Sequence, residues 1–401
     1  MSTYPLRLSP LGEGLINDTR LVEAGGNRFV LQRINGAVFA DADAIAGNLL
    51  QVQSWLGTQA NTTVRLPRLI RAAGGEATLR DADGQAWRLL EYIDNSRVVK
   101  PLENLAQAAE VGRALGRFHA ALAGLNPRRL ALTLPGLHDT PGYKARLEWV
   151  VTSTLSANAA DSAKTTKIDK TTRLGGIDAI GHPLLDQTRG SDSSLRRVDA
   201  VVASALAQIE ARAALIPLLQ QAWGDGRLAL SVTHGDPKLD NVLFAKGEDR
   251  ALCLIDLDTV QPGLLHQDVA DCLRSCCNRN GIASPHNGQP TDDKRLIGKP
   301  SATFDLDLCR ALLGGYAELA ASLFDNDSIA FLYPAIRLIP LELAIRFLTD
   351  YLQGDRYFRV TRPRQNLDKT LIQLALVADI EAKGAEIEHI IDDSFNRRWH
   401  R

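Results

Sequence analysis

The chain has 401 residues, enough for more than one domain, and its composition of 45% hydrophobic and 23% charged residues is that of an ordinary globular protein. Its formal net charge of -1 gives no electrostatic support for nucleic acid or an anionic membrane as a partner. The N-terminus lacks the apolar core of a signal peptide and no apolar run approaches a membrane span, so we expect a cytoplasmic protein.

Residues 6–93 have the pattern of β-strands with one helix between them. Gly12 and Gly14 stand in a turn before the first of two strand-like runs, and their backbone N–H groups could approach phosphates. Gly25-Gly26-Asn27 joins the two runs, which predicts a β-hairpin. The other predictions for this part are a helix from Asp43 to Leu56 and a second hairpin of residues 63–70 and 86–93 with a turn at Asp83-Gly84.

Residues 94–401 are predicted to be mostly helical. Two polar stretches, 153–194 and 278–301, are predicted to be surface loops inserted between helices. Asp268 and Asp271 are spaced nearly as in a capping box, with Asp268 as the N-cap of a helix. The five cysteines lie on apolar patterns without Cys-x-x-Cys spacing, which indicates buried, reduced thiols. The predicted helices cover residues 105–125, 195–219, 308–323, 334–350 and 367–383, and a further one begins near Pro141.

The polar residues that indicate chemistry lie in two short segments, Thr233 to Phe244 and Cys253 to Thr259, each containing an apolar strand-like run. Asp236 and Asn241 are five residues apart, the spacing of the kinase catalytic loop, and Asp256 ends the next strand. Phosphoryl transfer needs one carboxylate to orient the attacking hydroxyl and oxygen ligands for magnesium. Each residue alone is an ordinary turn former, but the set at this spacing favours catalysis.

Together with several other segments, these residues resemble the aminoglycoside phosphotransferase and choline kinase superfamily, and most closely the N-acetylhexosamine 1-kinases within it. The resembling segments follow the order of that family along most of the chain. They are Gly12 to Thr19, Phe29 to Asn35, His138-Asp139-Thr140-Pro141, Thr233 to Phe244, Ile255 to Gly263, Asp271 to Arg274 and Arg346 to Phe358.

The resemblance implies an α+β, bilobal protein-kinase-like fold. Residues 1–93 would form a nucleotide-binding lobe with a small antiparallel sheet and one helix, and residues 94–401 a mostly helical lobe for catalysis and substrate binding. The implied ligands are ATP and Mg²⁺, and the protein would be a monomer or homodimer.

The resemblance also implies a role for each matching site residue. Asp236 would accept the proton of the acceptor hydroxyl, Lys238 would contact the transferred phosphoryl group, and Asn241 and Asp256 would hold magnesium. Nucleotide contacts are implied for Gly14, Asn17, Thr19, Gln32 and the backbone of Glu91, Tyr92 and Ile93. Sugar contacts are implied for Leu15, Asp271, Arg274, Arg346, Asp350 and Tyr357. Arg346 and Asp350, four residues apart, would alternatively form a surface ion pair.

Two departures from the kinase pattern affect the nucleotide site. Gln32 stands where protein kinases carry the strand lysine, and the predicted helix offers Gln51 rather than a glutamate. We therefore expect phosphate binding to depend on loop amides, magnesium and Arg33. Leu15 stands where the sugar kinases often carry histidine, which would change specificity.

The function that these residues favour is ATP-dependent phosphorylation of an N-acetylhexosamine at its anomeric hydroxyl. A choline kinase would need an aromatic cage, and aromatic residues make up only 5% of the chain. An aminoglycoside kinase would need an acidic pocket, which Arg274 and Arg346 would oppose. A homoserine kinase and a catalytically inactive nucleotide-binding scaffold are further alternatives.

Overall fold

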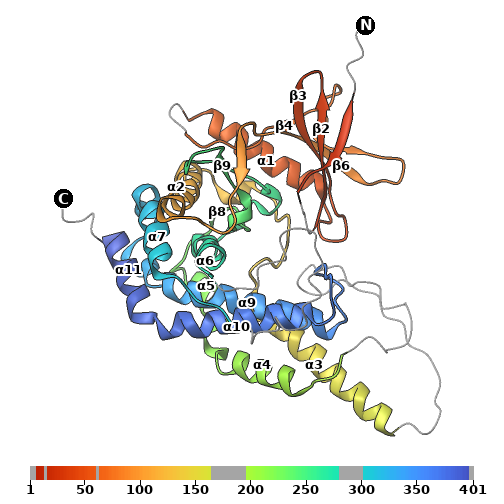
Figure 1. Ribbon diagram of the computed structural model, residues 1–401, viewed down its shortest axis with the longest axis vertical. Helices are drawn as coiled ribbons and strands as arrows, with labels where there is room; N and C mark the ends of the chain where they lie inside the picture. The colour runs from red at the N-terminus through yellow and green to blue at the C-terminus, as the bar shows by residue number, and fades with distance from the viewer. Residues whose placement is uncertain (1–5, 13–15, 60–62, 164–195, 280–300, 397–401) are drawn as a thin grey trace.

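The computed structural model describes residues 6–12, 16–59, 63–163, 196–279 and 301–396. A strand-rich N-terminal region adjoins a larger helical C-terminal region (Figure 1), as the sequence predicts. The N-terminal sheet is antiparallel in the order β1-β2-β3-β6-β4, and β5 also pairs with β6. Its strands are β1 Arg7–Pro10, β2 Asp18–Ala24, β3 Asn27–Arg33, β4 Leu69–Ile70, β5 Leu79–Arg80 and β6 Ala86–Glu91.

The first hairpin forms where its turn residues predict it. Gly25 and Gly26 join β2 to β3 with φ angles of 60° and 79°, which a tight hairpin turn requires and which glycine adopts without strain. Helix α1, Ala42–Gly57, begins after Asp41, whose carboxylate accepts hydrogen bonds from the backbone N–H groups of Asp43 and Ala44. Both predictions are confirmed.

The second hairpin is only partly as predicted. The strand that the turn at Gly84 joins to β6 is β5, whereas Leu69–Ile70 pairs with β6 as a separate strand, β4. A further turn, in which the Gly75 N–H donates to Ala72 O over 2.9 Å, interrupts the arm between β4 and β5. The domain boundary near residue 93 stays a prediction.

The helices of the C-terminal region pack around one apolar core. Helix α9 carries a fully buried face, and α2 packs along α7 through Gly112 and Gly315. The helices are α2 Leu105–Leu122, α3 Thr140–Ala163, α4 Ala200–Glu210, α5 Leu218–Gly224, α6 Leu265–Cys276, α7 Leu306–Ala320, α8 Asn326–Ile329, α9 Leu332–Leu352, α10 Gln365–Ala382 and α11 Gly384–Asn396.

Three of the helix predictions need correction. The helix predicted over 195–219 is broken into α4, a 3-10 turn at Ala213–Leu215 and α5, because Pro217 has no N–H to continue the ladder. Helix α3 continues to Ala163, so the first part of the stretch predicted as a loop from 153 is helical. Helix α11 was not predicted. Residues 164–195 and 280–300, the rest of the two predicted loops, lie outside the described residues.

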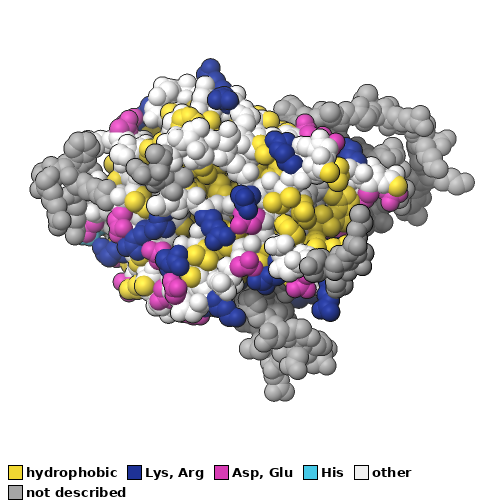
Figure 2. All heavy atoms as spheres, turned by 90° about the horizontal axis from the view of Figure 1, so that it is seen from above, with side chains coloured by type: hydrophobic (Ala, Val, Ile, Leu, Met, Phe, Trp, Pro, Cys, Tyr) yellow, Lys and Arg dark blue, Asp and Glu magenta, His cyan; other side chains and the backbone are white. Residues whose placement is uncertain are grey.

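The cysteines are buried, and the charged side chains on the surface are mixed in sign, as the near-neutral net charge leads us to expect. All five cysteines are buried and free, as predicted. Basic and acidic side chains are interspersed over the face seen in Figure 2, so this face has no large patch of one charge. Among the described residues, no single helix is long and apolar enough to cross a membrane. The bent pair Ala200–Glu210 and Ala213–Gly224 reaches the length and hydropathy of a membrane span only when its two segments are taken together.

Candidate active site

Two short antiparallel strand pairs bring the two motif segments together. Strands β9, Val242–Ala245, and β10, Ala251–Leu254, form a hairpin, so that Asn241 before it and Ile255 after it are neighbours, and Ile255 N donates to Asn241 O over 2.9 Å. Strands β8, Ser231–Thr233, and β11, Gln261–Gly263, pair in the same way. There the Thr259 hydroxyl donates to the carbonyl of His234 over 2.8 Å. The catalytic loop, residues 234–241, therefore lies against the metal loop, residues 255–260.

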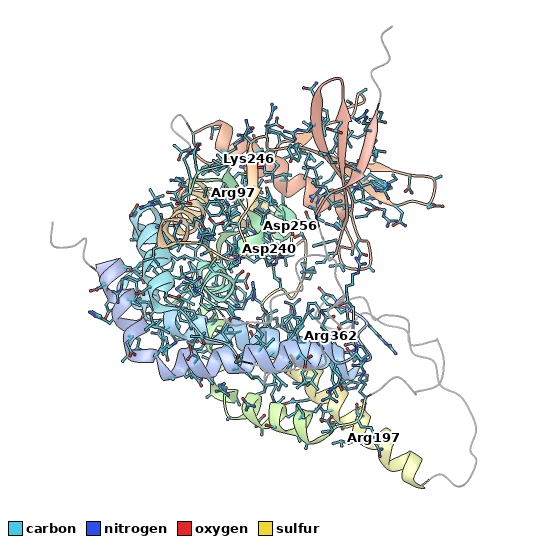
Figure 3. All side chains as sticks on the ribbon, viewed as in Figure 1. Arg97, Arg197, Asp240, Lys246, Asp256 and Arg362 are labelled. Carbon is cyan, nitrogen blue, oxygen red and sulfur yellow. The ribbon has the colours of Figure 1, made fainter. Side chains whose placement is uncertain are left out.

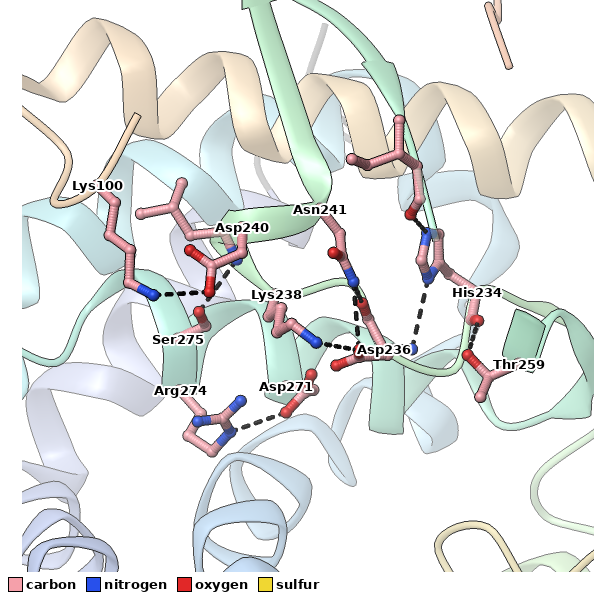
Figure 4. Close-up of polar contacts among 12 residues, drawn as sticks. Lys100, His234, Asp236, Lys238, Asp240, Asn241, Thr259, Asp271, Arg274 and Ser275 are labelled. Atoms are coloured by element: carbon pink, nitrogen blue, oxygen red, sulfur yellow. Dashed lines mark hydrogen bonds and ion pairs between the residues drawn. The ribbon is translucent and has the colours of Figure 1, made fainter. Parts of the chain in front are cut away.

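Asp236 lies at the centre of the catalytic loop and is held from two sides (Figure 4). Lys238 Nζ pairs with Asp236 Oδ2, and the Asn241 side-chain amide donates to Asp236 O over 2.7 Å and to Oδ2 over 3.2 Å. The side chain of Asp236 is 33% exposed, so a substrate can reach it. A carboxylate that is both oriented and accessible can align a hydroxyl group and accept its proton.

Lys238 links Asp236 to the metal loop. Burial alone lowers the pKa of Lys238, but the nearby carboxylates of Asp236, Asp256 and Asp271 outweigh it and raise the pKa above its usual range. Lys238 is therefore a permanent positive charge between these acids. Because Ile255 N donates to Asn241 O, the adjacent Asp256 lies beside the loop that carries Asp236.

Asp256 has an unusual backbone conformation at the end of β10. Its φ of 63° and ψ of 57° lie in the left-handed region, where few residues other than glycine are found and where strain accompanies functional positions. One side of Asp256 is open to solvent where the two regions of the chain meet (Figure 3). The protein around it and the neighbouring Asp258 raise its pKa to about 6, against the opposing effect of Lys238.

The donors around Asp256 fit magnesium as a nucleotide-borne ion rather than as a fully protein-bound one. Within the described part of the chain, no group of three or more His, Cys, Asp or Glu side chains could hold a metal. Asn241 uses its amide nitrogen on Asp236, so these contacts leave its amide oxygen available as a ligand. The binding of magnesium by Asn241 and Asp256 stays a prediction. Magnesium commonly takes one or two protein oxygens, with phosphate and water completing its shell.

Asp268, which sequence reasoning assigned to a helix cap, instead anchors the catalytic loop. Helix α6 begins after Leu264, and the Gln267 side chain accepts from Leu264 N over 3.3 Å, so the predicted capping box is wrong. The buried Asp268 carboxylate accepts from His234 N (2.6 Å), Gly235 N (2.9 Å) and the ring of His119 (2.9 Å). Burial opposes the charge of Asp268, but these contacts lower its pKa below the usual value. A buried, hydrogen-bonded aspartate thus fixes the backbone just before Asp236.

His119 and His234, the two histidines near Asp268, are buried and held by hydrogen bonds. His119 is buried, with its second ring nitrogen 2.9 Å from the hydroxyl of Tyr316, so both of its ring nitrogens have partners. His234 lies with its ring against Ile255 O at 3.0 Å, and burial lowers its pKa. His234 is therefore neutral near pH 7 and ties the catalytic loop to the metal loop.

Three of the predicted nucleotide residues lie on or beside β2 and β3, where the N-terminal sheet meets the metal loop. Asn17 donates to Asp258 over 2.5 Å and accepts from Asn35 N, while the Gln32 amide donates to the hydroxyl of Thr19 over 3.2 Å. Gly14, like the predicted sugar contact Leu15, lies outside the described residues. The contacts of Gly14, Asn17, Thr19 and Gln32 with a nucleotide therefore stay predictions.

The cation that contacts the metal loop from this face of the sheet is Arg88, which sequence reasoning missed. Thr19, Gln32 and Arg88 are register partners across β2, β3 and β6, so their side chains form one row. Arg88 donates to Gln32 Oε1 over 2.7 and 3.1 Å and pairs with the buried Asp258 of the metal loop. No local pattern would reveal a pair that is 170 residues apart in the chain.

Arg33, which the sequence analysis expects to contact phosphates, lies on the opposite face of the sheet. Its side chain is 46% exposed, 3.8 Å from Asp18, and its guanidinium lies over the ring of Trp87 at 6.0 Å. Alternation along β3 turns Arg33 away from Gln32 and the metal loop. Gln51 likewise lies elsewhere, because it donates to the carbonyl of Arg129 over 2.8 Å.

The predicted adenine contacts lie at the end of β6. Glu91 pairs with Arg65 and Arg68 at the edge of the sheet, and its N–H donates to Arg68 O over 2.8 Å. The Tyr92 ring lies under Arg28, and the carbonyl of Ile93 accepts from the hydroxyl of Ser96 over 2.6 Å. The binding of adenine by Glu91, Tyr92 and Ile93 stays a prediction.

On the acceptor side, α6 places Asp271 and Arg274 beside the catalytic loop (Figure 4). Arg274 Nε donates to Asp271 over 2.8 Å, and the charge of Asp236 also acts on Arg274. Burial lowers the pKa of Arg274, but these carboxylates raise it above its usual value. Asp271 and Arg274 thus form a largely buried ion pair near Lys238.

Arg346 lies farther along this side, in a cluster on α9 and the loops facing it. Its guanidinium is 3.9 Å from Glu342 and lies over the rings of Tyr143 (4.9 Å), Phe358 (5.6 Å) and Tyr357 (5.9 Å). Glu342 also contacts His138 at 3.1 Å and Thr140 at 2.8 Å, both of them in the segment His138-Asp139-Thr140-Pro141.

Asp350 does not form the surface ion pair with Arg346 that was the alternative interpretation. Asp350 is buried and accepts hydrogen bonds from the backbone N–H groups of Arg356, Tyr357 and Phe358 and from the Asn366 amide. It therefore holds the loop that presents Tyr357, whose side chain is exposed. Direct contact of Arg346, Asp350 or Tyr357 with a sugar stays a prediction.

Comparison with known proteins identifies the fold and the family. The structure is similar to an aminoglycoside phosphotransferase from Alicyclobacillus acidocaldarius, with a TM-score of 0.54, 14% identity, and 100% of this chain and 95% of that chain covered. A microcompartment-associated aminopropanol kinase matches with a TM-score of 0.53, 17% identity and coverage of 96% and 94%. The ethanolamine kinase of Plasmodium vivax matches with a TM-score of 0.50, 11% identity and coverage of 93% and 82%. The family model described as "Phosphotransferase enzyme family" matches residues 7–321, and the chain therefore belongs to this family of phosphotransferases.

Proposed function

We propose that this phosphotransferase transfers the γ-phosphoryl group of ATP to the anomeric hydroxyl of an N-acetylhexosamine. The observation that carries the phosphoryl-transfer part is the contact between the two loops: Lys238 and Asn241 hold Asp236, and Ile255 N, next to Asp256, donates to Asn241 O over 2.9 Å. One carboxylate is thereby oriented for an acceptor hydroxyl, and the other is directed to the same region for a nucleotide-bound cation.

The residues would divide the reaction as follows. Asp236 aligns the acceptor hydroxyl and takes its proton, while Lys238 lies beside it to contact the phosphoryl oxygens. Asn241 and Asp256 would hold Mg²⁺, which when bound neutralises charge on the phosphate groups. Because the transition state of phosphoryl transfer is loose, the contribution of the protein is mainly positioning, which the anchoring of the loop by Asp268 provides.

The charges on the acceptor side support a neutral, polyhydroxylated acceptor. Arg274 and Arg346 are both paired with carboxylates, and planar guanidinium groups of this kind donate several hydrogen bonds to hydroxyl and amide oxygens. A polycationic aminoglycoside would meet these two positive charges. The rings of Tyr143, Tyr357 and Phe358, which could surround a quaternary ammonium, already surround Arg346.

The proposal is tested by measuring ADP release with a set of acceptors and MgATP. The set contains N-acetylglucosamine, N-acetylgalactosamine, their 1-O-methyl glycosides, choline, homoserine, an amino alcohol and an aminoglycoside. We expect turnover with a free N-acetylhexosamine and none with its methyl glycoside, which lacks the anomeric hydroxyl. Turnover with the glycoside would move the reaction to another hydroxyl, and a preference for choline, homoserine or the aminoglycoside would overturn the sugar assignment.

A further inference from the structure

The N-terminal sheet carries a buried cation at the position where the nucleotide phosphates are expected. The side chain of Arg88 is 1% exposed and that of its partner Asp258 is 3% exposed. Two of the three guanidinium nitrogens of Arg88 have hydrogen-bond partners. Nε and Nη2 donate to Gln32 Oε1, and Nη2 also pairs with Asp258. Nη1 is buried and has no hydrogen-bond partner among the described residues.

A purely structural ion pair does not account for this arrangement. Burying two opposite charges usually gains little stability, because desolvation offsets their attraction. A buried donor that lacks a partner adds a further desolvation cost. Such a group is retained at functional sites when a ligand supplies the missing acceptor.

The cross-strand register shows why the cation is an arginine on β6. Protein kinases place a lysine on the third strand to contact the α- and β-phosphates, and here that position is Gln32. Arg88 is the register partner of Gln32 on the neighbouring strand, on the same face. The longer arginine side chain passes Gln32, which accepts two of its hydrogen bonds, and ends at the metal loop.

We propose that Arg88 is the phosphate-binding cation of the nucleotide site and takes the place of the missing strand lysine. Gln32 and Asp258 hold its guanidinium, and Nη1 is the donor that a phosphate oxygen of the nucleotide completes. Asp258, the partner of Arg88, lies two residues after Asp256 in the metal loop, so the guanidinium and the carboxylate expected to hold the cation belong to the same part of the site. This inference rests on the nucleotide part of the proposed function and is independent of the acceptor.

The test compares the binding of ADP and of adenosine by calorimetry in the absence of any acceptor. For Arg88→Gln we expect at least a tenfold loss of ADP affinity with adenosine affinity unchanged, since adenosine has no phosphate. Arg88→Lys should keep part of the affinity for ADP. Gln32→Lys combined with Arg88→Gln, which returns the cation to β3, should restore much of it. Arg33→Gln is the matched control on the other face of the sheet and should bind both ligands like the wild type.

The double variant Arg88→Gln with Asp258→Asn separates phosphate binding from charge compensation. It removes both buried charges, so it is the variant best able to fold if Arg88→Gln alone does not. We expect it to bind ADP at least tenfold more weakly than the wild type. Recovery of wild-type ADP affinity in this variant, or an equal loss for ADP and adenosine, would overturn the role of Arg88 and leave the proposed kinase intact. Failure of the wild type to bind ADP and ATP would overturn the nucleotide site itself.

Discussion

At the scale of single residues, Asp236 is the group on which turnover depends most. Replacement by asparagine keeps the shape of the side chain but removes its ability to accept a proton. We expect Asp236→Asn to lower kcat by about 10²–10⁴-fold, with nucleotide affinity nearly unchanged. Steady-state turnover with the best acceptor and calorimetry with ADP measure the two effects.

Asp240 provides a matched control in the same loop. Its side chain is 37% exposed and pairs with Lys100 at 2.7 Å, away from Asp236. Asp240→Asn should therefore keep wild-type turnover, because a surface ion pair of this kind is worth less than about 1 kcal/mol. Equal activity of Asp236→Asn and Asp240→Asn would contradict the role of Asp236.

The role of a residue could be predicted from the sequence only where the residues that act together lie close to one another along the chain. Asp236, Lys238, Asn241 and Asp256 could be found together because one loop and one strand end contain them all. Asp268 was assigned the wrong role. Its carboxylate accepts hydrogen bonds from the backbone N–H groups of His234 and Gly235, which lie 34 and 33 residues earlier in the chain. Only the folded sheet shows that Arg88 and not Arg33 is the cation near the metal loop.

At the scale of elements, the conformation of the catalytic loop depends on Gly235. Its φ is +83°, and a Cβ added there would lie 2.6 Å from Thr259 O. We expect Gly235→Ala to destabilise the protein and to lower turnover, since the metal loop must move away from Asp236. Gly247→Ala is the matched control, because its φ of +81° gives the same backbone strain of about 1–2 kcal/mol with open space around the Cβ. Equal urea unfolding and equal turnover of the two variants would contradict this account.

The packing of α2 against α7 offers a second pair of matched glycines. A Cβ on Gly315 would collide with the backbone carbonyl of Ala109 in α2, whereas one on the adjacent Gly314 meets nothing within 4 Å. We expect Gly315→Ala to lower the free energy of unfolding by about 1–3 kcal/mol, or more, and Gly314→Ala to raise it by up to about 1 kcal/mol. Denaturant unfolding measures both. Similar values for the two variants would show that the helices are not in close contact.

Element prediction succeeded where the signal was local and failed where a single residue broke a longer pattern. The Gly25-Gly26 turn and the helix from Asp43 to Leu56 are predicted from adjacent residues alone. The apolar periodicity over 195–219 concealed the break at Pro217. The pairing of both β4 and β5 with β6 depends on the assembled sheet and cannot be predicted from either short segment alone. The positions of α9 and α10 were predicted well, because both helices are long and rich in apolar residues, whereas α11 was missed.

At the scale of the whole molecule, His266 gives stability a defined pH dependence. It is buried near Phe324 and contacts Ser328 O at 2.8 Å, and burial lowers its pKa to about 4. Between pH 6.5 and 4 the unfolded chain takes up a proton at this site and the folded protein does not. This residue should therefore lower the free energy of unfolding by up to about 3 kcal/mol over that window as the pH falls, with no further loss below it.

Urea unfolding of the wild type and of His266→Gln from pH 7 to pH 4 measures this effect as a difference between two curves. We expect the variant to lose stability less steeply over this window. His389→Gln, at a histidine whose side chain is 69% exposed, is the control and should follow the wild type. Parallel curves for the wild type and His266→Gln would contradict the assignment.

The account as a whole is tested most directly by following the phosphorus atoms of ATP. The protein is incubated with MgATP and N-acetylglucosamine, and the ³¹P NMR spectrum is recorded for the wild type and for Asp236→Asn. We predict that the wild type converts ATP to ADP and produces a phosphomonoester coupled to the anomeric proton, while the variant leaves ATP intact. Intact ATP with the wild type and every acceptor tested, or the same product at the same rate with Asp236→Asn, would contradict the account.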